Sequence, residues 1–215
     1  MKYGESAFDL LYLLFAVLSG CLLLARGKDR EARCMGLAAL VLGCGDAFHL
    51  VPRVLNSFVS GDLTAALGVG KLITSVTMTV FYLLLYSLWR LHYGRQEGRG
   101  LRAALWVLAA VRIVLCLLPQ NGWLENRSDV LWGVVRNVPF VLLGAAVCFL
   151  YFRERRRDRV FRFLWLYILL SFLFYLPVVV AAGLVPMLGM LMLPKTVCYI
   201  LMIAAFLRAA KKGRA

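Results

Sequence analysis

An acid, an imidazole and a guanidinium occur close together in the apolar stretch from Gly45 to Arg53. Asp46 and His49 are three positions apart, and His49 and Arg53 are four apart. On an α-helix these spacings place all three side chains on one face. Such groups are costly inside a membrane unless they meet a polar partner or a watery cavity, so they predict a functional site. Basic residues within other apolar stretches are Lys71, Arg112, Arg136 and Lys195.

The elements that would position these side chains are long apolar stretches. Of the 215 residues, 62% are hydrophobic, which is too many for a water-soluble domain of this size. A membrane span needs about 20 apolar residues. The sequence predicts an all-α polytopic integral membrane protein, a single domain over residues 1–215 with seven transmembrane helices. The expected spans are about 7–25, 35–57, 65–89, 102–118, 130–152, 161–184 and 187–208.

The basic residues are distributed unevenly between alternate connections. Eighteen of the 25 Lys and Arg residues lie in the first, third and fifth connections and in the C-terminal tail, counting Arg102, Arg162 and Arg208 at the span ends next to them. Basic residues of membrane proteins accumulate on the cytoplasmic side. We therefore expect the N-terminus outside and the C-terminus in the cytoplasm, in a multi-pass protein of the bacterial cytoplasmic membrane. The net charge of +14 is then a topology signal that contacts membrane lipids, and no nucleic acid is expected as a partner. The oligomeric state is not predicted.

In this orientation, the charged residues of five predicted helices all fall between the membrane midplane and the outer surface. Among these charged residues Asp46 is the one acid, whereas five are Lys or Arg. A single carboxylate cannot neutralise five cations in a medium of low dielectric. This predicts an outward-facing cationic pocket that binds or transports an anionic or amphiphilic ligand, a phosphate- or carboxylate-bearing lipid or metabolite. In the alternative, several of these cations extend to the outer headgroups. The expected ligand-binding residues are Arg53, Lys71, Arg112, Arg136, Asn137, Tyr175 and Lys195.

A second function stays open, that of a membrane lipid-modifying hydrolase. Asp46 and His49 would then form an acid–base pair while the arginines hold a phosphate. The sequence contains no GxSxG or HExxH pattern, so it does not support the usual serine or metal hydrolases. None of the six cysteines is part of a CxxC pair, and neither a metal site nor a cofactor is expected. Whether the protein is an enzyme is left undecided.

Two short motifs resemble the YhhN, or lysoplasmalogenase, family: Gly45-Asp46, and Leu193-Pro194 followed by Tyr199-Ile200-Leu201. Members of that family are polytopic membrane proteins that have been assigned to cleavage of the vinyl-ether bond of lysoplasmalogens. The resemblance implies activity on a membrane lipid. The chain departs from the family in having seven predicted spans where eight are usual, and in having no acid in its last three spans.

A third function is that of a retinal-binding photoreceptor. Seven spans, an outside N-terminus and a lysine in the seventh span resemble the microbial rhodopsins, as does Phe174-Tyr175-Leu176-Pro177 in the sixth. The resemblance implies that Lys195 forms the Schiff base. That family usually places the counter-ion on the third helix, which has no acid here, so Asp46 would have to replace it.

Overall fold

The computed structural model describes residues 2–59, 61–96, 98–126, 129–181 and 185–212. Within these ranges every regular element is an α-helix or a 3₁₀-helix. Seven helices in the described part of the chain are long and apolar enough to cross a membrane, as the sequence predicts. The elements in order are α1 Lys2–Arg26, α2 Arg30–Phe58, α3 Thr64–Tyr93, α4 Arg99–Leu117, η1 Pro119–Asn121, η2 Trp123–Glu125, α5 Val130–Glu154, α6 Leu164–Ala181, η3 Pro186–Leu191 and α7 Met192–Lys212.

Most helices extend beyond the predicted spans by a few residues, and α2 and α3 show two local reasons. The carboxylate of Asp29 accepts a hydrogen bond from the backbone amide of Ala32 (3.2 Å), so α2 begins well before the predicted start at residue 35. Helix α3 continues to Tyr93 and ends at Gly94, which has a φ of 58° that a glycine adopts without strain. Residues 182–184 of the sixth predicted span lie outside the described residues.

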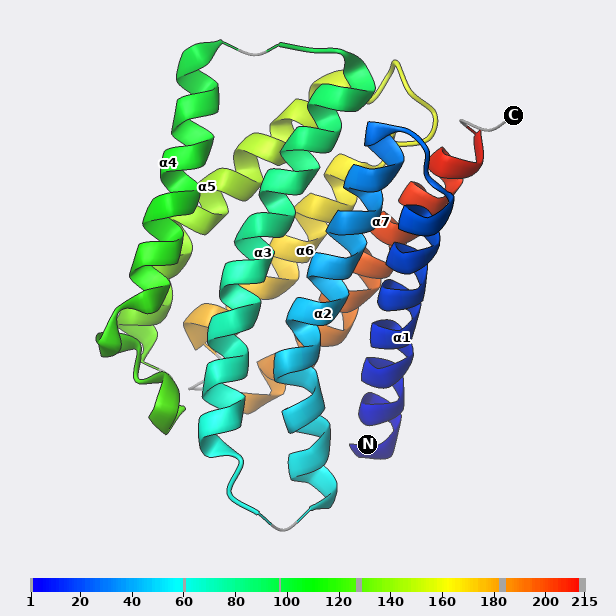
Figure 1. The fold of residues 1–215 in the computed structure, drawn as a ribbon. Coiled ribbons are helices and arrows are strands. Elements are labelled where there is room, and N and C mark those ends of the chain that lie inside the picture. The colour runs from blue at the N-terminus through cyan, green and yellow to red at the C-terminus, as the bar shows by residue number, and fades with distance from the viewer. Residues whose placement is uncertain (1, 60, 97, 127–128, 182–184, 213–215) are drawn as a thin grey trace.

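Consecutive helices run antiparallel and pack side by side, with α1 between α2 and α7 and with α4 packed on α3 and α5 (Figure 1). The N- and C-termini therefore lie at opposite ends of the bundle (Figure 1). The α1–α2, α3–α4 and α5–α6 connections share one end with the C-terminal part of α7. Because these segments hold most of the basic residues, we call this end the basic end. The other end holds the N-terminus.

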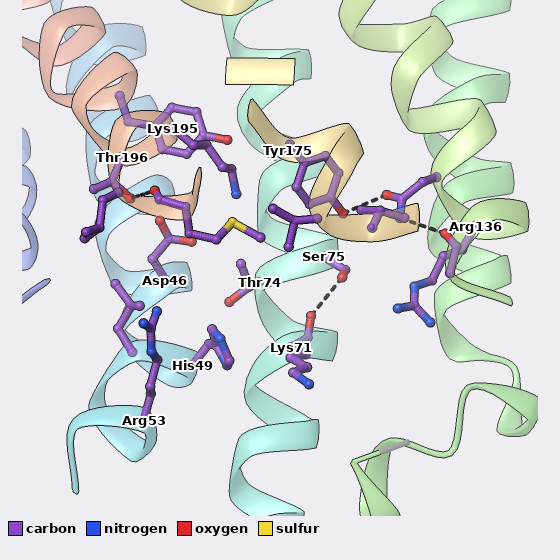
Figure 2. Close-up of a pocket in the computed structure, with 18 of the residues that line it drawn as sticks. Asp46, His49, Arg53, Lys71, Thr74, Ser75, Arg136, Tyr175, Lys195 and Thr196 are labelled. Atoms are coloured by element: carbon purple, nitrogen blue, oxygen red, sulfur yellow. Dashed lines mark hydrogen bonds between the residues drawn. The ribbon is translucent and has the colours of Figure 1, made fainter. Parts of the chain in front are cut away.

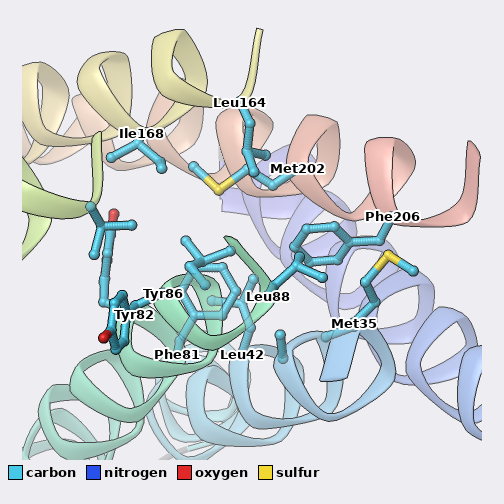
Figure 3. Packing of buried hydrophobic residues seen from close by; sticks show 14 of the residues in the cluster. Met35, Leu42, Phe81, Tyr82, Tyr86, Leu88, Leu164, Ile168, Met202 and Phe206 are labelled. Carbon is cyan, nitrogen blue, oxygen red and sulfur yellow. The ribbon is translucent and has the colours of Figure 1, made fainter. Parts of the chain in front are cut away.

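Aromatic and aliphatic side chains fill the half of the bundle nearest the basic end. Phe81, Leu88 and Phe206 have no exposed surface, and Tyr86 has 2%. Figure 3 shows side chains of α2, α3, α6 and α7 meeting in this cluster. Such close packing of side chains from four helices fixes the positions of the helices relative to one another.

His92 joins three segments at the basic end. Its Nδ1 lies 2.7 Å from Glu31 Oε1 on α2, and its Nε2 lies 3.0 Å from Asp158 Oδ2 in the α5–α6 connection. A neutral imidazole has only one N–H, so both contacts are hydrogen bonds only when the ring is protonated. The backbone amides of Val160 and Phe161 also donate to Asp158. Partial burial raises the pKa of Asp158, but these amides and the charge of His92 outweigh it and hold that pKa below its usual value.

Glu154 is the centre of a second group of charges at this end. Its side chain is almost fully buried, with its residue 3% exposed. Its Oε1 lies 3.2 Å from Nε of Arg95, and its Oε2 lies 3.5 Å from Nη1 of Arg157. At the basic end, buried and half-buried carboxylates are thus paired with cations.

Candidate functional site

A cavity of about 380 Å³ occupies the half of the bundle nearest the N-terminus. Its wall is formed by side chains from α1, α2, α3, α5, α6 and α7 and from η2. This volume lies in the range of pockets that bind small molecules. Among the predicted site residues, the wall contains Asp46, His49, Arg53, Lys71, Arg136, Asn137, Tyr175 and Lys195 (Figure 2).

Two glycines of α3 let this helix approach its neighbours closely beside the cavity. A Cβ atom on Gly70 would collide with the backbone carbonyl of Phe48 in α2, and a Cβ atom on Gly68 would collide with the carbonyl of Trp123. Thr74 Oγ1 adds a hydrogen bond of 3.0 Å to the carbonyl of Gly45. This contact holds α3 against the part of α2 that carries the acid and the imidazole.

Arg53 is neutralised by acids of α1. Its Nη2 lies 3.4 Å from Glu5 Oε2, and its Nη1 lies 4.0 Å from Asp9 Oδ2. Asp9 and Asp129 both belong to the cavity wall, so the expectation of one acid against five cations is wrong. Asp9 lies within the first predicted span, and this position was the signal that could have identified it.

Asp46 is held in place by a tyrosine of α1. Tyr12 is buried, and its hydroxyl donates a hydrogen bond of 2.7 Å to Asp46 Oδ2. On the same face of α2, His49 Nδ1 is buried and has no hydrogen-bond partner among the described residues. A buried polar atom without a partner is unusual in a folded protein. In Figure 2, Asp46, His49 and Arg53 lie together on one side of the cavity.

Lys71 and Arg136 have neutral partners. Lys71 Nζ donates to Asn126 Oδ1 (2.7 Å), and Arg136 Nη1 donates to Asn121 Oδ1 (2.7 Å). The Arg136 guanidinium also lies 4.5 Å from the ring centroid of Trp123. The sequence analysis did not identify Asn121 and Trp123 as partners, because both lie in the segment between α4 and α5, outside the predicted spans. The positive charge of both cations is left without a carboxylate within 4.0 Å among the described residues.

Lys195 reaches the cavity from the first turn of α7. Its Nζ lies 4.8 Å from the ring centroid of Tyr175 and 5.3 Å from that of Tyr199. Contacts of this kind stabilise a cation by about 0.5–2 kcal/mol. Among the described residues, this ammonium has no hydrogen bond and no carboxylate within 4.0 Å, and the Asp46 carboxylate attracts it only from a longer distance. We refer to Lys71, Arg136 and Lys195 as the cavity cations.

Arg112 is not brought to the cavity wall. It is 1% exposed and lies behind α5, where Nη1 donates a hydrogen bond to the carbonyl of Arg136. Its guanidinium lies 5.1 Å from the ring centroid of Phe140. In this position Arg112 supports the backbone that carries Arg136.

The hydroxyl of Tyr175 donates a hydrogen bond of 2.9 Å to Asn137 Oδ1, which joins α6 to α5 at the cavity wall. In this site each carboxylate has a hydrogen-bond donor or a cation beside it, whereas the direct contacts of the cavity cations are with neutral groups. Such a site is suited chemically to holding an anionic group. The likeness to the lysoplasmalogenase family and to the rhodopsins stays a prediction. No protein-family model matches this chain, and comparison with curated proteins and with solved structures finds no match either.

Proposed function

We propose that this protein is a multi-pass membrane protein that binds or transports an anionic or amphiphilic ligand in its cavity. The ligand carries a phosphate or a carboxylate, and the cavity cations hold that group. The observation that carries this proposal is the set of partners of Lys71, Arg136 and Lys195, which are amides and aromatic rings and not carboxylates. A cation in a site of low dielectric is stabilised by a bound anion more than by a neutral group.

The carboxylates of the wall do not replace the ligand in this role. Asp9 is close to Arg53, and Asp46 accepts from Tyr12. Asp129 Oδ1 accepts from the backbone amides that begin α5. Each acid thus has its own donor or cation within 4.0 Å, and Asp46 acts on Lys195 only from a longer distance, so positive charge remains for a ligand anion.

The distribution of basic residues supports an outward-facing cavity as part of this proposal. The connections that carry most of the Lys and Arg residues lie at the end of the bundle away from the cavity. If the basic end faces the cytoplasm, as the positive-inside rule expects, the cavity opens toward the other side of the membrane.

A binding experiment with chemically matched probes tests the proposal. Purified protein in lipid nanodiscs is titrated with octyl phosphate, octanoate and octanol, and bound probe is measured by native mass spectrometry. We expect at least one anionic probe to bind and the neutral alcohol not to bind. Lys195→Met and Arg136→Gln should each weaken binding at least tenfold, which corresponds to about 1.4 kcal/mol.

The control for this experiment is Arg99→Gln, which removes an exposed cation at the basic end. It should leave the affinity for the anionic probes unchanged. Equal binding of octanol and octyl phosphate would contradict the proposal. So would unchanged affinities in both cavity variants.

A second candidate function, acid–base catalysis on a lipid, is favoured by one specific observation. His49 Nδ1 is buried without a hydrogen-bond partner among the described residues, and His49 and Asp46 both line the cavity, so this nitrogen is available to exchange a proton with a bound molecule. Wild type and Asp46→Asn are incubated side by side with a total lipid extract. Consumption of one lipid by the wild type alone would make the protein an enzyme, and retention without turnover by both would favour the binding protein.

The retinal-binding alternative depends on Lys195. It requires a Schiff base at Nζ, and such a pigment absorbs visible light. Incubation with retinal followed by an absorption spectrum tests this directly, with Lys195→Met as the control.

A further inference from the structure

An apolar groove runs along the outside of the bundle between α5 and α6. It has a volume of about 200 Å³. Val138, Leu142 and Val180 border it, and each has about half of its surface exposed. Among the described residues of the groove wall, Asn137 is the one with a polar side chain. In a protein whose helices span a bilayer, this groove faces the hydrocarbon of the lipids and not water.

The groove and the charged cavity are adjacent, and two residues belong to the walls of both. These are Asn137 of α5 and Val179 of α6. Gly133 lies one turn before Asn137 and faces Val179, since a Cβ atom built on it would lie 3.9 Å from the nearest atoms of Val179. Because glycine has no side chain, this position adds nothing to the layer between the groove and the cavity. The boundary between a charged space and an apolar one is therefore a single layer of side chains.

Both helices that form this boundary contain a proline close to it. Pro139 lies two residues after Asn137, and Pro177 lies two residues before Val179. Each proline lacks the N–H that would bond one turn back, so the helix bends more easily there. The hydrogen bond from Tyr175 to Asn137 is the polar contact that joins α5 and α6 at this level.

We propose that the ligand is a single-chain anionic amphiphile whose hydrocarbon chain lies in the groove between α5 and α6 while its headgroup lies among the cavity cations. This inference rests on the proposed function, because it needs an anion in the cavity. It adds the class of ligand and the route: the headgroup enters the cavity from the lipid past Asn137 and Val179, and the chain stays in the groove. A polar space and an apolar space in contact fit a molecule with the same two parts, whereas a small water-soluble anion would leave the groove unused.

The test uses an alkyl phosphate with a diazirine near the end of its chain, which crosslinks to neighbouring side chains when illuminated. A diazirine alcohol of the same chain length is the neutral control, and methyl phosphate is the probe without a chain. Protein in nanodiscs is labelled, digested and mapped by mass spectrometry. We expect the anionic probe to label α5 and α6 around the groove at least fivefold more than the alcohol does. Methyl phosphate should reduce this labelling.

Two variants separate the groove from the rest of the lipid-facing surface. Val138→Trp fills the groove and should reduce labelling there at least fivefold while leaving the affinity for methyl phosphate unchanged. Leu131→Trp places the same ring on an exposed part of α5 that does not border the groove, and should change neither.

The outcomes distinguish this inference from the proposed function. If methyl phosphate binds but the anionic probe labels the groove no more than the alcohol does, or labels another pair of helices, the route is overturned and the anion site stands. If methyl phosphate does not bind and the two photoprobes label alike, both proposals fail.

Discussion

Charged side chains at the two ends of the bundle have different kinds of partners. At the basic end, His92 lies between two carboxylates, and Glu154 lies between two arginines. At the cavity end, Lys71, Arg136 and Lys195 contact amides and aromatic rings. Charges that are paired with one another stabilise a structure. Charges that have no partner of opposite sign stay available to a ligand. The difference predicts that variants at the basic end lower stability, while loss of a cavity cation lowers binding.

The largest effect on stability is expected where the cavity wall depends on close contact between backbones. In Gly70→Ala the added methyl group collides with the Phe48 carbonyl, so α2 and α3 must separate. The free energy of unfolding should fall by about 3 kcal/mol. It is measured by titration with sodium dodecyl sulfate in mixed micelles. Gly61→Ala is the control, since nothing lies within 4 Å of its Cβ position. Equal stability of the two variants would show that the cavity wall does not depend on this contact.

A smaller loss is expected from His92→Ala. The variant leaves Glu31 and Asp158 without their shared donor, and the unfolding free energy should fall by about 2 kcal/mol. Affinity for octyl phosphate should stay the same, because the cavity lies in the other half of the bundle. A loss of affinity comparable with that of Lys195→Met would contradict the proposed difference between the two ends. Arg99→Gln, at the same end, serves as the control.

The carboxylate of Asp158 makes the basic end sensitive to acid. Its pKa is lower in the folded protein than the ordinary value of 3.8, so its contribution to stability is complete above that pH. The contribution is lost as the pH falls from about 4 toward the lower folded pKa. Since solvent screens this half-buried group, the loss should be less than about 1 kcal/mol. In Asp158→Asn, thermal unfolding between pH 5 and pH 3 should depend less on pH. An identical pH dependence in wild type and variant would assign the acid sensitivity to other groups.

The smallest effect on stability is expected from Lys195→Met. The variant removes a cation that has no acceptor among the described residues and keeps an apolar stem of similar length. The unfolding free energy should change by less than about 0.5 kcal/mol, while the affinity for an anionic probe falls at least tenfold. Thermal unfolding and native mass spectrometry on the same sample test both parts. A large loss of stability with unchanged affinity would make Lys195 a structural residue.

The comparison also shows where reasoning from the sequence was limited. The spacing of Asp46, His49 and Arg53 correctly placed them on one face, because the geometry of a helix is local. The pairing of Arg53 with Glu5 and Asp9 brings together residues more than 40 positions apart, and no local pattern contains it. Arg112 and Arg136 look alike in sequence, yet only Arg136 reaches the cavity.

The sequence by itself determined the number of apolar helices and the alternation of basic connections, because length, hydropathy and charge are properties of each segment alone. It also determined which residues would be costly in a bilayer. Only the tertiary structure decided which of these residues have partners, because partners come from other helices and depend on the rotation of each helix about its axis. The Tyr12–Asp46 contact and the cavity beside the apolar groove are consequences of that packing.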